Sequence, residues 1–84
     1  MRVTIEKDKH YVVQLNNGLV LVGIAENDSW YDPEKRLPPP RLRLGKQVMT
    51  INPRAVAAYW EDDSIPWGMY SQKKFLELVR EDRE

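Results

Sequence analysis

The residues of this 84-residue chain that are best placed to do chemistry are six basic side chains near its middle. Residues 35–54 contain no acidic residue, and their basic residues are Lys35, Arg36, Arg41, Arg43, Lys46 and Arg54. Both flanks are acidic: residues 1–34 hold three basic and six acidic residues, and residues 55–84 hold four basic and seven acidic residues. Such segregation favours a partner on one face, although a solvated loop can also produce it.

Arg41, Arg43 and Lys46 fall on the outward side of a predicted strand and in the turn that follows it. Cations spaced in this way can follow the phosphate backbone of a nucleic acid. They can equally form the charged solvent face of an edge strand, where charge prevents unwanted pairing. The second interpretation is the simpler one for this stretch alone.

No group of residues in the sequence is typical of catalysis or of metal binding. His10 is the one histidine, the chain has no cysteine, and the acidic run Glu61, Asp62 and Asp63 has no accompanying nucleophile. A metal site or a general base requires further ligands or partners at suitable spacing. We therefore expect no enzyme activity, no cofactor and no metal.

Short segments of alternating or β-branched residues predict five strands, over residues 10–15, 19–26, 41–44, 47–51 and 55–61, and residues 2–6 read as a short strand or the start of one. Asn17-Gly18 predicts a hairpin with a type I′ turn, and Gly23 permits a bend in the second strand of that hairpin. That strand, "LVLVGIAE", is apolar on both faces. It should be covered on both sides, as in a tightly bent barrel or an oligomer.

A loop over residues 63–70 should lead to a helix over residues 71–83. Ser71 is a suitable N-cap, and the helix interior is expected over Gln72–Asp82. Its apolar stripe contains Phe75, Leu76, Leu78 and Val79. This stripe should dock on the body of the protein or on a neighbouring subunit.

The length predicts a single domain over residues 1–84 with a small core of its own. Without cysteine, self-association is the remaining way to bury more apolar area. The first apolar run follows several charged residues, and no apolar segment approaches the ~20 residues that cross a bilayer. We expect a cytoplasmic protein with no membrane contact.

Two segments resemble the signatures of the Sm/Lsm/Hfq family. "VVQLNNGLVLVGIAEND" is similar to the first signature, with Gly18 and Gly23 at its two glycines, and "QVMTINPRAVAAYWED" resembles the second. The resemblance implies a mostly β protein: a five-stranded, strongly bent SH3-like barrel of the Sm type over residues 2–62, here with a C-terminal helix. It also implies a homo-oligomeric ring of roughly five to seven subunits in which the fourth strand pairs with the fifth strand of the next copy.

The same resemblance suggests where single-stranded RNA would bind. It places Asp28, Trp30 and Tyr31 in a loop at the pore, where an aromatic ring can stack on a base, and it places Asn52 and Arg54 in the second signature. Trp30 can instead cover the barrel mouth or a subunit interface. Arg54 can instead form a rim ion pair with Glu61, Asp62 or Asp63 of a neighbour.

Two functions remain open at this point. The first is a non-catalytic ring that binds single-stranded RNA through Asp28, Trp30, Tyr31, Arg41, Arg43, Lys46, Asn52 and Arg54. The second is a structural or adaptor barrel that mediates protein–protein assembly, with a possible protein partner on the C-terminal helix. Zero net charge favours the second function, and the basic run favours the first.

Overall fold

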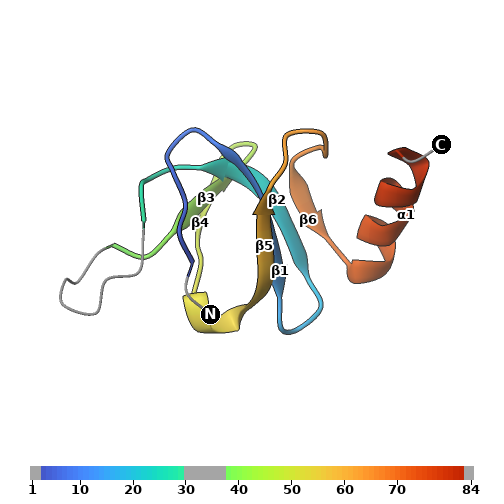
Figure 1. Cartoon of the computed structure of the whole chain (residues 1–84), viewed down its shortest axis with the longest axis horizontal. Helices are drawn as coiled ribbons and strands as arrows, with labels where there is room; N and C mark the ends of the chain where they lie inside the picture. The colour runs from blue at the N-terminus through green and yellow to red at the C-terminus, as the bar shows by residue number, and fades with distance from the viewer. Residues whose placement is uncertain (1–2, 30–37, 83–84) are drawn as a thin grey trace.

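A computed structural model describes residues 3–29 and 38–82 of the protein. Within this part the chain forms six strands and one α-helix (Figure 1). The strands are β1 (His10–Leu15), β2 (Val20–Ala25), β3 (Arg41–Leu44), β4 (Gln47–Thr50), β5 (Val56–Glu61) and β6 (Gly68–Tyr70). A short 3-10 helix, η1 (Pro53–Ala55), precedes β5, and helix α1 (Gln72–Asp82) ends the described chain.

The strands form one antiparallel sheet in the order β4-β3-β2-β1-β5, and β6 is added to the side of β2. Strands next to each other in the sequence mostly pair with each other, but β5 returns to pair with β1. The register brings Val12 opposite both Val22 of β2 and Trp60 of β5. This pairing places the first and last predicted strands of the body side by side.

The β1–β2 hairpin forms where the sequence predicts it, but its turn differs from the prediction. Gly18 has a φ of 93°, whereas Asn17 is not among the residues with positive φ. Gly18 donates its N–H to Leu15 at 3.0 Å, and Leu15 donates to Leu19 at 2.8 Å. The loop therefore has three residues with glycine in the left-handed position, a common hairpin alternative to the type I′ turn.

Strand β2 is the centre of the sheet because it pairs with β1 on one side and with β6 and β3 in turn on the other. Residues Val20–Val22 pair with β6 on the side where Ile24 and Ala25 pair with β3. Gly23 lies at this change of partner, and a Cβ atom there would be 2.5 Å from the Arg43 carbonyl oxygen. Only glycine permits this close approach of two backbones.

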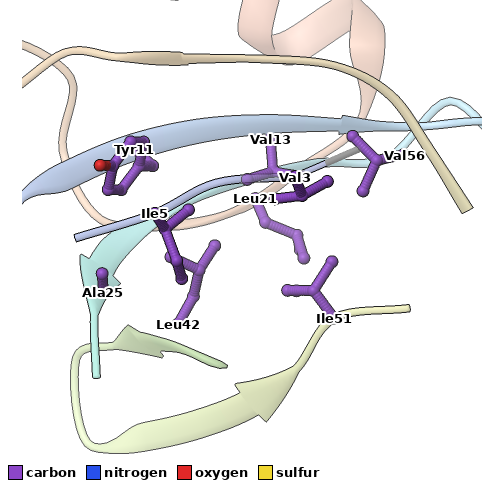
Figure 2. Packing of buried hydrophobic residues seen from close by; sticks show 9 residues of the cluster. All are labelled: Val3, Ile5, Tyr11, Val13, Leu21, Ala25, Leu42, Ile51 and Val56. Atoms are coloured by element: carbon purple, nitrogen blue, oxygen red, sulfur yellow. The ribbon is translucent and has the colours of Figure 1, made fainter. Parts of the chain in front are cut away.

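The inner face of the sheet carries the larger core (Figure 2). Tyr11 and Val13 point into it from β1, which confirms the predicted alternation along that strand. Its buried members come from the N-terminal segment, from β1, β2, β3 and β5, and from the residue after β4: Val3, Ile5, Tyr11, Val13, Leu21, Ala25, Leu42, Ile51 and Val56. The N-terminal segment thus packs over this face, with Thr4 donating its N–H to the Tyr59 hydroxyl at 2.9 Å.

The outer face of the sheet carries a second, smaller core. Val12, Val20 and Val22 are buried there beneath Ile65 and Phe75. Figure 1 shows α1 beside β6, at the end of the molecule away from β3 and β4. The two-sided cover predicted for β2 is therefore confirmed, and on the outer face it comes from the chain's own C-terminal segment.

Helix α1 begins where its sequence predicts. Ser71 Oγ accepts the N–H of Lys74 at 3.2 Å, which confirms the predicted N-cap. Phe75 is buried and Val79 packs against the outer core, while Leu76 stays 48% exposed. Apolar packing of one side of the helix therefore fixes α1 to the sheet.

Three details of the predicted fold are wrong. The sheet is not closed into a barrel, because β4 and β5 end the strand order and do not pair with each other. The strand count rises to six, since residues 68–70 of the predicted loop add β6 to β2. Within the described residues 3–6, the N-terminal segment forms only an isolated bridge between Ile5 and Ser29.

Candidate functional site

The β3–β4 hairpin positions three of the predicted basic residues. Leu42 is buried and Leu44 half-buried on the inner side of β3, so Arg41 and Arg43 project from the outer side, as their alternation predicts. Lys46 lies in the turn between β3 and β4 and is exposed. The three cations thus lie on one hairpin, at the part of the outer face that α1 leaves open.

Arg43 is not available as a free cation, because Glu26 binds it. The Arg43 guanidinium donates two hydrogen bonds to the Glu26 carboxylate, at 2.9 and 2.8 Å. These hydrogen bonds keep the pKa of Glu26 below its ordinary value and raise the pKa of Arg43. Among the described residues, Arg41 and Lys46 have no such carboxylate partner.

Asn52 and Arg54 shape the turn before β5. Asn52 Oδ1 accepts the Arg54 N–H at 3.0 Å and so caps η1, while the Arg54 carbonyl accepts from Asn16 Nδ2 at 3.1 Å. The side chain of Arg54 is exposed and forms no ion pair with a described residue. The structure gives Asn52 a capping role and leaves the Arg54 charge open to solvent.

Asp28 also has a structural role. Its Oδ1 accepts the Lys7 N–H at 2.8 Å, which ties the turn of the N-terminal segment to the end of β2. The neighbouring predicted residues Trp30 and Tyr31 lie outside the described part of the chain. The RNA-stacking role of these two aromatic residues stays a prediction.

A shallow hollow lies where the start of β1 meets the end of β5. Its lining residues are Asp8, Lys9, His10, Glu61, Asp62 and Asp63. Lys9 forms an ion pair with Glu6 at 3.0 Å and a longer one with Glu61 at 3.9 Å. The hollow is therefore acidic, and the sheet brings together charges that are far apart in the sequence.

Two side chains at this hollow are held by specific hydrogen bonds. Trp67 Nε1 donates to His10 Nδ1 at 3.4 Å, with the two ring centroids 6.1 Å apart. The Ser64 hydroxyl and N–H donate to Asp62 at 2.6 and 2.8 Å, and these bonds keep the pKa of Asp62 below its ordinary value. His10 thus has an aromatic partner that the sequence did not indicate.

The described residues contain no group of three or more His, Cys, Asp or Glu residues that could hold a metal ion. In the same part of the chain, no helix is long and apolar enough to cross a membrane.

The chain matches no protein-family model, and no curated protein or solved structure was found to match it. The functional interpretation therefore depends on the residues and the geometry described here.

The most distinctive feature of the sheet is that β4 and β5, the strands at the two ends of the strand order, have one strand partner each among the described residues. The short β6, which pairs with β2 alone, is the third strand with a single partner. The Ile51 N–H donates to the Pro40 carbonyl beside β3, and the Asp62 N–H donates to the His10 carbonyl of β1. These two bonds show which backbone groups of β4 and β5 point toward the neighbouring strand and which point away from it. Because bonding alternates along a strand, the backbone groups of Val48 and Thr50 point outward from β4, and those of Tyr59 and Glu61 point outward from β5.

Sequence reasoning named β4 and β5 as edges but missed β6 and the acidic hollow. The hollow forms because Tyr11 pairs with Glu61, which brings Asp8 and Lys9 beside the acidic run after β5. The sequence shows charged residues just before β1 and at the end of β5. Their proximity depends on the β1–β5 pairing, which local patterns do not specify.

Proposed function

We propose that this protein is a non-catalytic assembly module whose copies join edge to edge, β4 of one copy to β5 of the next, in a closed homo-oligomeric ring. The observation that carries the proposal is the pair of open edges at the two ends of the strand order. A contact between two different edges is head-to-tail, and it leaves no free β4 or β5 edge only when the chain of copies closes.

The composition of β4 supports this proposal. Its four residues, Gln47–Thr50, include no charged residue, and Val48 is 44% exposed. Proteins that keep an edge strand unpaired commonly place charges, prolines or bulges on it. An uncharged edge of this kind is therefore suited to pair with another strand.

Such a ring would also explain the open sheet. The five-stranded Sm-type barrel implied by the resemblance requires β4 and β5 to have neighbours on both sides. In a ring each copy would supply the missing neighbour of the next, and the sheet would continue from copy to copy.

Multi-angle light scattering of the full chain tests the ring directly. We expect wild-type protein to have a mass several times the 9.9 kDa of one chain. Val48→Pro should reduce the mass to that of a single chain. The outward N–H of Val48 is not needed for pairing with β3, so Val48→Pro removes an intermolecular donor and spares the fold. Val48→Thr keeps the N–H and is the matched control. A wild-type monomer at high concentration would refute the proposal.

Binding of single-stranded RNA is a second candidate function, favoured by the exposed side chains of Arg41 and Arg54, which form no ion pair with a described residue. A ring would repeat these cations around its axis, and repeated cations bind phosphates with strong salt dependence. Trp30 and Tyr31 remain the predicted stacking residues of this function.

A gel-shift assay with single-stranded RNA at low salt tests this second function. Arg41→Gln should weaken binding and flatten its salt dependence, because it removes a free cation. Lys73→Gln is the matched control, since it removes an equal charge from the exposed start of α1, at the end of the molecule away from β3 and β4. Absence of any shift with RNA of varied composition would leave assembly as the function of the module.

A further inference from the structure

We infer that Lys46 of each copy forms an ion pair with the acidic end of β5 in the next copy, and that this pair fixes the direction in which the two edge strands join. The inference rests on the edge-to-edge assembly proposed above. It assigns to Lys46 a protein partner in place of the RNA phosphate predicted from the sequence.

The first step is the distribution of charge along the two edges. Strand β4 is uncharged, but Lys46 directly precedes it. Strand β5 follows the exposed Arg54 and ends at Glu61, and Asp62 and Asp63 come directly after it. Each edge thus has a cation before its start, and only β5 has carboxylates at its end.

This distribution distinguishes the two directions of pairing. Parallel strands would bring Lys46 beside Arg54 of the neighbour, and like charges in such a position repel. Antiparallel strands would bring Lys46 beside the carboxylates at the far end of β5. Charge complementarity therefore favours the antiparallel arrangement of β4 and β5.

The backbone groups that point outward from β4 and β5 limit the register in which the two strands of neighbouring copies can pair. Antiparallel pairing should place Val48 opposite an outward-bonding residue of β5 in the next copy, either Tyr59 or Glu61, because these residues carry the unpaired groups. If Val48 faces Tyr59, Lys46 faces Glu61. If Val48 faces Glu61, then Lys46 faces Asp63. Lys46 meets a carboxylate in both registers.

The partners are accessible for this contact. Lys46 is exposed and forms no ion pair with a described residue. The Glu61 side chain is 58% exposed, and its contact with Lys9 is 3.9 Å long, whereas Lys9 lies 3.0 Å from Glu6. Asp63 is exposed as well. A neighbouring ammonium group can therefore reach Glu61 without displacing a tight internal pair.

Charge-reversal variants test the inference by sedimentation velocity at low and high salt. Lys46→Glu and Glu61→Lys should each weaken association roughly tenfold at low salt, with a smaller loss at high salt. The double variant should recover association to within about twofold of wild type, because the opposite charges again face each other. Lys73→Glu, an equal charge change on the exposed start of α1, is the control and should leave association unchanged.

The failures of the two proposals are distinguishable. If Lys46→Glu associates as tightly as wild type while Val48→Pro is monomeric, the ion pair is refuted and edge pairing stands. If Glu61→Lys alone weakens association and Lys46→Glu does not, β5 pairs with a second β5 and the inference is overturned. If Asp63→Lys, but not Glu61→Lys, restores Lys46→Glu, the ion pair stands in the second register. A monomeric wild type refutes both proposals.

Discussion

The two faces of the sheet are covered in different ways, although they share strand β2. The inner face is covered by the N-terminal segment and by residues at both ends of the sheet, from Val3 to Val56. The outer face is covered by a C-terminal unit of β6 and α1, which reaches the sheet through Ile65 and Phe75. Beyond this unit, near β3 and β4, the outer face is open and carries the Glu26–Arg43 pair.

This difference indicates that the inner core is integral to the fold and the outer core is an attachment. Residues of the inner core come from almost every part of the sheet, so its loss should unfold the whole domain. The outer core depends on a short strand and one helix, and local units of this kind can open below the global unfolding free energy. The following variants test that distinction.

The largest loss of stability is expected from Phe75→Ala. Phe75 is 4% exposed and its ring centroid lies 6.0 Å from that of Trp60. Truncating a buried aromatic side chain costs about 3–5 kcal/mol, and we expect most of this loss to appear as opening of β6 and α1. Hydrogen exchange should show lost protection in α1 while the amides of β1 and β2 that bond to each other stay protected.

Leu42→Ala is the counterpart on the inner face. It should lower the free energy of unfolding by about 2–5 kcal/mol and reduce protection in all strands together. Equal loss of hydrogen-exchange protection across sheet and helix in both variants would show that the two cores unfold as one unit. The distinction between an integral inner core and an attached outer core would then be wrong.

A smaller effect is expected from Gly23→Ala, which tests the point where β2 changes partner. The new Cβ would meet the backbone oxygen of Arg43, so β2 and β3 must separate, at a cost of about 1–3 kcal/mol in chemical denaturation. Gly68→Ala in β6 is the control, since its nearest neighbours are side-chain atoms of Tyr70 at 3.3 Å. A larger loss in the control would contradict the central position assigned to Gly23.

The smallest loss of stability should come from breaking the Glu26–Arg43 ion pair on the open part of the outer face. Because folding lowers the pKa of Glu26, the pair stabilises the protein above the ordinary pKa of a glutamate. That stabilisation is lost as the pH falls through the lowered pKa. Urea denaturation should therefore show wild type to be more stable than Glu26→Gln at pH 7, with a smaller difference at pH 3. A constant difference at both pH values would exclude the pair as the cause.

Much of the fold follows from local patterns. The alternation from Tyr11 to Leu15, the turn at Gly18 and the cap at Ser71 each depend on residues a few positions apart. The hairpin type was wrong because an Asn-Gly pair fits both two-residue and three-residue loops. Strand β6 was missed because three residues around a glycine have too little periodicity to indicate a strand.

The candidate site was less predictable than the fold. The sequence identified Arg41, Arg43 and Lys46 as outward, but Arg43 differs from the others only because Glu26 lies across the ladder. Likewise, Asn52 and Asp28 were predicted as RNA ligands, and in the structure both accept backbone hydrogen bonds. These roles depend on neighbours that are brought together only by folding.

The sequence by itself determined where five of the six strands and the helix lie and which side chains of β1 and β3 face inward, because periodicity and turn residues act within a few positions of the chain. The tertiary structure decided that β5 returns to β1, that α1 covers the outer face, and that β4 and β5 remain open as edges. These features depend on pairing between distant segments, and the free energy of such pairing is a sum over contacts that no single stretch of sequence contains.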